Sequence, residues 1–236
     1  MSTPLPWAVT NPSPISQLTE NLWCVTDEIP GIRGTNRRMT IVKRADGGLL
    51  FYNAIPLREE QMAEIGALGT PAQLFVPHHL HCLHAHAFST RLHLAVFAPD
   101  AGLAMVRASM PAALAHSALP GDPTIAVHTV DGLKTGEGVM LVRSASGTSL
   151  LVADLVTNAP HIGDLSGLLM RVVGFTASRP IMPRPVRMRV GKDMKQVKRL
   201  LEELATTPGL MRLIPSHGDI LSMGAPEALR TIAGGL

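Results

Sequence analysis

Aromatic side chains are scarce in this chain of 236 residues, which has two Trp, one Tyr and five Phe. Many proteins that bind single-stranded nucleic acids stack bases on aromatic rings, so this scarcity weighs against that class of function. The formal net charge of +3 is also too small for a dedicated nucleic-acid binder. We therefore expect no nucleic-acid partner. Hydrophobic residues still make up 46% of the chain, so Leu, Val, Ile, Met and Ala must fill the core.

Cysteine is nearly absent, with Cys24 and Cys82 as its two occurrences. Two cysteines in so long a chain do not make the disulfide framework of a small secreted domain. Long apolar runs are missing too, because no stretch approaches the roughly 18 apolar residues of a membrane span. The Pro-rich start from Met1 to Pro14 has no apolar signal core. We expect a soluble, cytoplasmic protein with no membrane partner.

The order of apolar runs and turns predicts a single α/β domain over residues 1–236, with residues 1–17 irregular. Short apolar or β-branched runs predict strands at residues 22–26, 39–43, 49–52, 73–76, 94–97, 125–130, 139–142, 150–153 and 210–214. Apolar residues at helical spacing predict helices at residues 57–68, 193–204 and 225–232. This order suits two mixed sheets packed face to face with helices outside.

Six of the ten histidines lie in one segment: His78, His79, His81, His84, His86 and His93. In an extended turn, His79 and His81 project to the same side, and His84 can join them where the next helix starts. Neutral imidazole suits Zn, Fe and similar ions. The segment therefore predicts a metal site, with a structural or degenerate cluster as the alternative. Cys82 lies between two proposed ligands, and we expect it to be a small buried hydrophobe.

The segment His79-Leu80-His81-Cys82-Leu83-His84 resembles the His-x-His-x-Asp-His loop of the metallo-β-lactamase superfamily. Three other stretches resemble parts of that family in the same order along the chain. Residues 36–52 resemble its opening hairpin, residues 150–154 the strand that ends in a metal-bridging aspartate, and residues 214–218 the late strand with a His-Gly ligand. The resemblance covers nearly the whole chain and implies a four-layer αββα sandwich with two mixed β-sheets.

The resemblance also implies a ligand set, which consists of His79, His81, His84, Asp154 and His217. In the family pattern, His79 and His81 match ligands of a first metal, and His84 and His217 match ligands of a second. Asp154 lies between the two. We expect Asp154 and His84 to take part in catalysis as well as in metal binding.

The sequence departs from the family pattern in several places. Leu83 stands where the family has an aspartate, and Asn53 where many relatives carry one. Residues 131–136, which match the family's Gly-His-Thr stretch, contain no histidine, although His128 lies just upstream. Asp219 is the nearest candidate to replace the missing carboxylate.

Charge limits the number of ions. Asp154 is the one clear carboxylate of the set, and two divalent ions would leave buried positive charge without a partner. We therefore expect one ion, which is Zn or alternatively Fe or Mn.

These residues predict a metal-dependent hydrolase, in which a metal-bound hydroxide attacks an ester, thioester, amide or phosphoester of a small-molecule substrate. The alternative is a catalytically degenerate member of the fold that binds a ligand or partner. Iron redox chemistry and a nuclease are further alternatives. The basic stretch from Arg179 to Arg199 prompts the nuclease and also an anionic small substrate. The oligomeric state stays open.

Overall fold

Short strands and helices alternate along the chain. The computed structural model describes residues 5–159 and 174–236. The strands are β1 (Ser16–Thr19), β2 (Leu22–Ile29), β3 (Ile32–Lys43), β4 (Gly48–Tyr52), β5 (Thr70–Phe75), β6 (Ala95–Ala98), β7 (Leu114–Ala115), β8 (Ile125–Thr129), β9 (Gly138–Ser144), β10 (Gly147–Val152) and β11 (Leu210–Pro215). The helices are α1 (Glu59–Leu68), α2 (Ala85–Leu92), α3 (Leu103–Arg107), α5 (Met194–Leu204) and α6 (Ala225–Gly234). Short turns include the 3₁₀ turn η1 (His79–His81) and the π-helical turn η4 (Val186–Val190).

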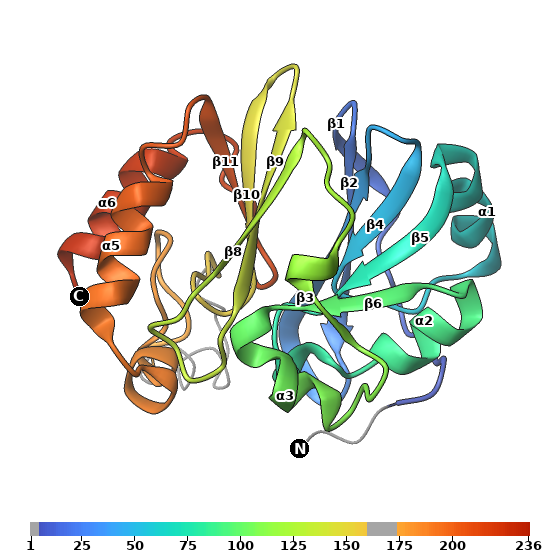
Figure 1. The fold of residues 1–236 in the computed structure, drawn as a ribbon, viewed down its shortest axis with the longest axis horizontal. Helices are drawn as coiled ribbons and strands as arrows, with labels where there is room; N and C mark the ends of the chain where they lie inside the picture. The colour runs from blue at the N-terminus through green and yellow to red at the C-terminus, as the bar shows by residue number, and fades with distance from the viewer. Residues whose placement is uncertain (1–4, 160–173) are drawn as a thin grey trace.

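The strands form two mixed sheets (Figure 1). The first has the order β1-β2-β3-β4-β5-β6-β7 and the second the order β11-β10-β9-β8. In the first sheet β1 to β4 pair antiparallel and β4 to β7 pair parallel. In the second, β10 and β11 pair parallel, whereas β8, β9 and β10 pair antiparallel.

The two sheets pack face to face because each strand presents apolar side chains at alternate positions. The layer between them consists of Leu22, Val42, Leu50, Tyr52, Phe75, Phe97, Met140, Val142, Leu151 and Ile214. The outer face of the first sheet packs on α1 and α2, and that of the second sheet packs on α5 and α6 (Figure 1). These four layers confirm the predicted αββα sandwich.

Burial explains where the elements differ from the predicted ranges. Helix α1 begins at Glu59 instead of Leu57, because the N-cap residue Arg58 has extended backbone angles. Leu57 precedes the helix and is fully buried, which explains why it fits the apolar spacing. Strands β2 and β3 extend well past the apolar run, since Asp27 pairs with Arg37 and both side chains are buried although they are charged. Apolar periodicity cannot signal such a pair.

The N-terminal segment runs along the outer face of the first sheet. It has no helix or strand from residue 5 to 15. The indole of Trp7 stacks on Phe88 with ring centroids 5.7 Å apart, and the Arg91 guanidinium lies 4.4 Å from the centre of that indole. The amide of Leu5 donates a hydrogen bond of 2.8 Å to the carbonyl of Leu83. The segment thereby braces the loop that carries the histidines.

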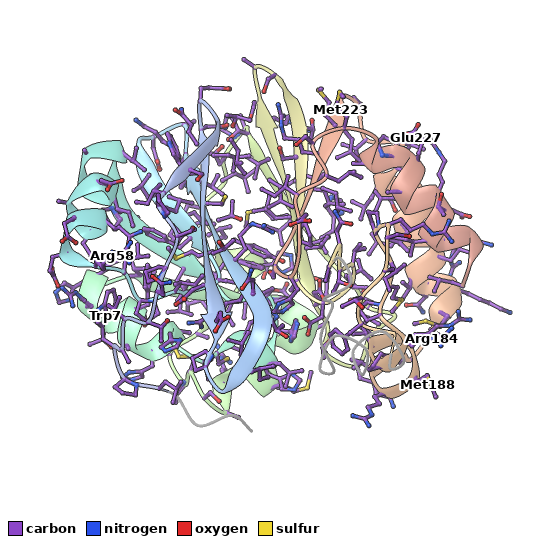
Figure 2. The ribbon with its side chains drawn as sticks, turned by 180° about the vertical axis from the view of Figure 1, so that it is seen from behind. Trp7, Arg58, Arg184, Met188, Met223 and Glu227 are labelled. Atoms are coloured by element: carbon purple, nitrogen blue, oxygen red, sulfur yellow. The ribbon has the colours of Figure 1, made fainter. Side chains whose placement is uncertain are left out.

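The basic stretch from Arg179 to Arg199 is largely exposed. Arg184 and Met188 project outward near η4, and Met188 is 81% exposed (Figure 2). Arg187 donates hydrogen bonds to the carbonyls of Gly235 and Leu236 at 2.8 and 3.1 Å, so it holds the end of the chain. In the part of the chain that the structure describes, no helix has both the length and the apolar character needed to cross a bilayer.

Candidate metal centre

Three loops meet beyond the carboxyl ends of β5, β10 and β11. The loop after β5 carries the histidine segment, the loop after β10 carries Asp154, and the loop after β11 carries His217. Parallel pairing places the ends of β10 and β11 side by side, with Val152 opposite Pro215. This pairing brings two residues that are far apart in sequence to one edge of the second sheet.

The carboxylate of Asp154 is the centre of the site. Its Oδ2 lies 3.2 Å from Nε2 of His78, and its Oδ1 lies 3.3 Å from Nε2 of both His81 and His217. Donor atoms of His78, His81 and Asp154 all lie within 4.8 Å of one another. The four side chains range from 1% exposed for His78 to 23% for Asp154, so the site is shielded but open to solvent on one side.

Hydrogen bonds fix the orientation of two of these rings. Nδ1 of His217 donates to the carbonyl of Asn36 at 2.8 Å. Nδ1 of His81 donates to Oδ1 of Asn53 at 2.8 Å. Nε2 of His81 also lies within hydrogen-bond distance of Oδ1 of Asp154, at 3.3 Å. A neutral ring donates from one nitrogen alone, and the shorter contact assigns the proton of His81 to Nδ1, as the Asn36 carbonyl does for His217. The lone pair of each Nε2 then faces Asp154 and can bind a cation.

Asn53 supports the site through both ends of its amide. Its Nδ2 donates to the carbonyl of Arg38 at 3.0 Å and to Oγ of Ser216 at 2.6 Å. These two acceptors identify Nδ2 as the nitrogen and leave Oδ1 for His81. An aspartate at this position would have no donor for the Arg38 carbonyl, which accounts for Asn in place of the acid that the resemblance leads one to expect.

Glu137 was not predicted from the sequence. It is fully buried, and its carboxylate accepts hydrogen bonds from the amides of Ala153, Asp154 and Leu155 at 2.8, 3.1 and 2.9 Å. It thereby holds the turn that carries Asp154. Glu137 directly follows residues 131–136, where a histidine was sought. Flanked by Gly136 and Gly138, it has no sequence feature that separates it from an ordinary turn residue.

The charges of the site depend on one another. Burial acts to raise the pKa of Asp154, but the charge of His78 and the polar contacts with the three imidazoles outweigh it and hold that pKa well below its usual range. Burial raises the pKa of Glu137 to about 7 and lowers the pKa of His81 to about 4. The pKa of His78 is raised by the negative charge of Asp154, although burial opposes this. A buried anion surrounded by imidazoles requires positive charge beside it, which protons or a metal ion supply.

Three of the five proposed ligands, His81, Asp154 and His217, lie together. His78, His81 and Asp154 form the group whose donor atoms are within 4.8 Å of one another. His217 adjoins this group through its contact of 3.3 Å with Asp154, whereas His79 is not part of it. The reason is that residues 79–81 form a 3₁₀ turn instead of an extended one. His78 caps this turn, because its side chain accepts the amide proton of Leu80, and the centroid of its ring then lies 4.5 Å from that of His81.

His84 is also outside the group. Its Nδ1 lies 2.8 Å from Nη1 of Arg37, and a guanidinium can only donate, so that lone pair is occupied. Burial and the charge of Arg37 lower the pKa of His84 to about 4. Asp219 is exposed and Leu83 is half-buried, and both line the cleft that leads to the site.

This cleft has a volume of ≈ 690 Å³. His81, Asp154 and His217 form one wall, and apolar side chains that include Ile29, Leu80 and Phe175 form others. None of the described residues from Arg179 to Arg199 lines it, so the basic stretch does not surround this cleft.

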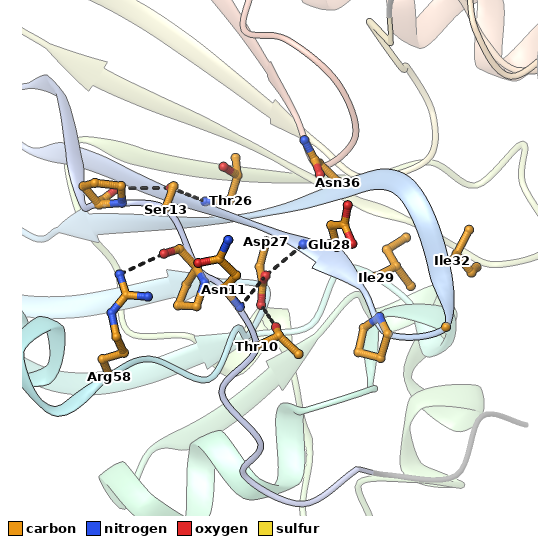
Figure 3. A pocket seen from close by; sticks show the side chains of 14 residues that line it. Thr10, Asn11, Ser13, Thr26, Asp27, Glu28, Ile29, Ile32, Asn36 and Arg58 are labelled. Atoms are coloured by element: carbon orange, nitrogen blue, oxygen red, sulfur yellow. Dashed lines mark hydrogen bonds between the residues drawn. The ribbon is translucent and has the colours of Figure 1, made fainter. Parts of the chain in front are cut away.

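A second hollow of ≈ 870 Å³ lies between the N-terminal segment and the β2–β3 hairpin (Figure 3). Two carboxylates, those of Asp27 and Glu28, line it. Asp27 already accepts hydrogen bonds from Thr10 Oγ1 and from the amides of Asn11 and Glu28 (Figure 3). The carboxylate of Asp27 is therefore used in holding the N-terminal segment to β2, and the cleft at Asp154 is the better candidate for a metal site.

This chain resembles known proteins in its fold but not in its sequence. No family model matches the sequence, and no curated protein matches it. The solved structure of DIM-1 metallo-β-lactamase exposed to ceftazidime is similar, with a TM-score of 0.66 and 14% identity over 97% of this chain and 99% of that one. FIM-1 metallo-β-lactamase from Pseudomonas aeruginosa in the mono-zinc form has a TM-score of 0.63 and 13% sequence identity, over 99% of this chain and 97% of that one. A metallo-β-lactamase from Erythrobacter litoralis with β-mercaptoethanol in its active site has a TM-score of 0.62 and 14% sequence identity, over 94% of this chain and 96% of that one. The chain has the metallo-β-lactamase fold.

Proposed function

We propose that the protein is a metal-dependent hydrolase with one metal ion held by His81, Asp154 and His217. The observation that carries the proposal is the convergence of two Nε2 atoms, from His81 and His217, on one carboxylate oxygen at 3.3 Å each. Two imidazoles and a carboxylate form a donor set that zinc accepts, and iron and manganese accept it as well. The fold neighbours are metallo-β-lactamases, one of them in a mono-zinc form, which supports this choice.

The fit extends to charge. With Asp154 ionised and both histidines neutral, one divalent ion leaves a net charge of about +1 at the ligands, and the buried carboxylate of Glu137 lies directly behind Asp154. Residues 5–159 and 174–236 offer a second ion no ligand set of its own, because His84 is engaged by Arg37 and Leu83 has no donor atom. We therefore propose a single ion.

A bound ion of this kind polarises a carbonyl or phosphoryl group and lowers the pKa of a water molecule. The protein contributes the rest. Asn36 and Asn53 orient the two imidazoles, and Glu137 fixes the turn of Asp154. The apolar side of the cleft would bind the body of a small ester, thioester, amide or phosphoester and exclude water from it.

A second candidate is a protein of the same fold that binds a ligand without turning it over. The observation that favours it is Leu83, an apolar residue that lines the cleft where the family pattern has a proton-handling aspartate. This protein would keep the metal and the cleft but show no turnover.

Metal analysis of the whole chain tests the proposal. We expect about one equivalent of Zn, Fe or Mn per chain in the wild type, and less than about a tenth in His81→Ala and His217→Ala, because each variant loses a ligand. His86→Ala is the matched control, since His86 is exposed on α2 and outside the site. A wild type that stays metal-free after soaking would overturn the proposal. Bound metal with no hydrolysis across ester, thioester, amide and phosphoester probes would favour the second candidate.

A further inference from the structure

Four donor side chains surround the proposed ion, and their number decides what the centre can do. Zinc sites with four protein ligands are closed and structural, whereas catalytic sites keep a position free for water or substrate. If His78 bound the ion together with His81, Asp154 and His217, a tetrahedral centre would be full. The role of His78 is thus the point on which catalysis depends, and an inference about it rests on the proposed function.

The hydrogen bond at Nδ1, the ring nitrogen that faces away from Asp154, distinguishes His78 from His81 and His217. Nδ1 of His78 accepts the amide proton of Leu80 at 3.3 Å, as part of the cap of η1. The neutral ring therefore carries its proton on Nε2, the atom that faces Asp154. His81 and His217 have the opposite arrangement, since their Nδ1 atoms donate. Two rings are preset as ligands and one as a donor.

One oxygen of Asp154 faces the two histidines that are proposed as ligands, and the other faces His78. Oδ1 lies 3.3 Å from Nε2 of both His81 and His217, whereas Oδ2 lies 3.2 Å from Nε2 of His78. The latter contact is electrostatic, because Nε2 of His78 has no aligned hydrogen-bond partner among the described residues. A buried N–H so close to a carboxylate oxygen attracts it strongly where water is excluded.

The backbone sets His78 and Asp154 relative to each other. Glu137 accepts hydrogen bonds from the turn that carries Asp154, and its Oε2 lies 3.9 Å from Nε2 of His78. The next residue, Gly138, donates its amide proton at 2.9 Å to the carbonyl of Pro77, which precedes His78. Residues 137–138 therefore link the two loops directly behind the site.

We propose that His78 is a positioning residue and not a fourth ligand. Its Nε2–H holds Oδ2 of Asp154, so the carboxylate offers Oδ1 alone to one ion. The centre then has three protein ligands and keeps a coordination position open towards the cleft.

Three variants of the whole chain test this inference. Glutamine at position 78 restores an N–H donor but binds zinc poorly, whereas leucine fills the space without a donor. His81→Gln is the matched control for the loss of a true ligand. The measurements are Zn²⁺ affinity by competition with a chromophoric chelator, and the visible spectrum of the Co²⁺-loaded protein. Thermal unfolding of the metal-free chains checks the fold.

We expect His78→Gln to keep its Zn²⁺ affinity within about tenfold of the wild type and to keep the Co²⁺ spectrum. We expect His78→Leu to bind about 10- to 100-fold more weakly, and His81→Gln more weakly still. If His78→Gln loses as much affinity as His81→Gln and its Co²⁺ spectrum changes in the same way, His78 is a ligand and the inference is wrong. If His78→Leu matches the wild type, His78 has no positioning role. A wild type without bound metal overturns the proposed function itself.

A second measurement needs no variant. In the ¹H–¹⁵N spectrum of the imidazoles of the zinc-loaded wild type, we expect a protonated Nε2 and an unprotonated Nδ1 for His78, and the reverse for His81 and His217. A protonated Nδ1 on His78 with a metal-shifted Nε2 would contradict the inference.

Discussion

Asn53 occupies a backbone conformation that few residue types adopt without strain, with φ of 69° at the end of β4. Its amide joins strand β3, the loop after β11 and the turn η1, since it contacts Arg38, Ser216 and His81. No apolar pattern signals such a residue. Its importance follows from the acceptors and the donor that the fold places around it.

Asn53→Asp keeps the size and the tolerance of positive φ but removes the N–H donor. We expect the free energy of unfolding to fall by about 2 kcal/mol, because the buried carbonyl oxygen of Arg38 then loses its donor and faces a carboxylate oxygen. Urea unfolding at neutral pH measures this. Unchanged stability would show that the amide of Asn53 does not anchor these three elements.

His84 predicts a pH dependence of stability. Burial and the Arg37 guanidinium lower its pKa in the folded chain to about 4, below the ordinary value near 6.5. As pH falls, the unfolded chain takes up the proton first, so this contribution to stability is complete above about pH 6.5 and is lost on the way to pH 4.

Between pH 7 and pH 5 the unfolding free energy of the wild type should fall by roughly 1 kcal/mol more than that of His84→Gln, which lacks the titrating ring. This figure includes a reduction for solvent screening. Urea unfolding at the two pH values gives the comparison. Parallel losses in both proteins would contradict the assignment of a depressed pKa to His84.

The loop after β11 owes its shape to contacts with other elements. The guanidinium of Arg38 in β3 donates to the carbonyls of Pro215 and Gly218, on both sides of His217. Gly218 has φ of +88°, and a Cβ there would lie 2.3 Å from the carbonyl oxygen of Asn158. The loop that presents His217 therefore has little room to change.

Gly218→Ala should disturb this loop. We expect a loss of at least about 2 kcal/mol in unfolding free energy and weaker Zn²⁺ binding, since both φ strain and a backbone clash arise. Gly224→Ala is a matched control, because Gly224 has φ of +81° but no atom within 4 Å of the point where a Cβ would lie. It should show the φ strain alone and normal Zn²⁺ binding. Equal behaviour of the two variants would rule out the clash as the cause.

At the scale of the whole molecule, the proposed ion joins the two sheets. His81 follows a strand of the first sheet, whereas Asp154 and His217 follow strands of the second. An ion held by all three binds the folded chain and has no such site in the unfolded one, so binding stabilises the fold.

Zinc should therefore raise the unfolding temperature. At a free concentration of about 100 times Kd, the gain is about 2.7 kcal/mol, which corresponds to a rise of about 5–10 °C for a chain of this size. Thermal unfolding with Zn²⁺ and with a chelator measures it, and His217→Ala should show almost no shift. A rise of the same size in His217→Ala would place the stabilising zinc elsewhere.

The sequence alone determined the layers of the fold. Whether a side chain is buried in a strand or helix follows a short period, so the apolar runs predicted most strands and the helices α1, α5 and α6. The same runs missed β1, β7, α2 and α3, which are short. The spacing of the histidines also pointed to His81, and the resemblance to the metallo-β-lactamase superfamily implied Asp154 and His217.

Tertiary structure decided which neighbours these residues have. The choice of His78 over His79 depends on a 3₁₀ turn, which the spacing of histidines does not specify. The turn of His84 towards Arg37 and the place of Glu137 behind Asp154 depend on side chains from other elements. A local pattern can show that a residue is able to donate, accept or bind, but the partner that it meets is set by the packing of distant segments.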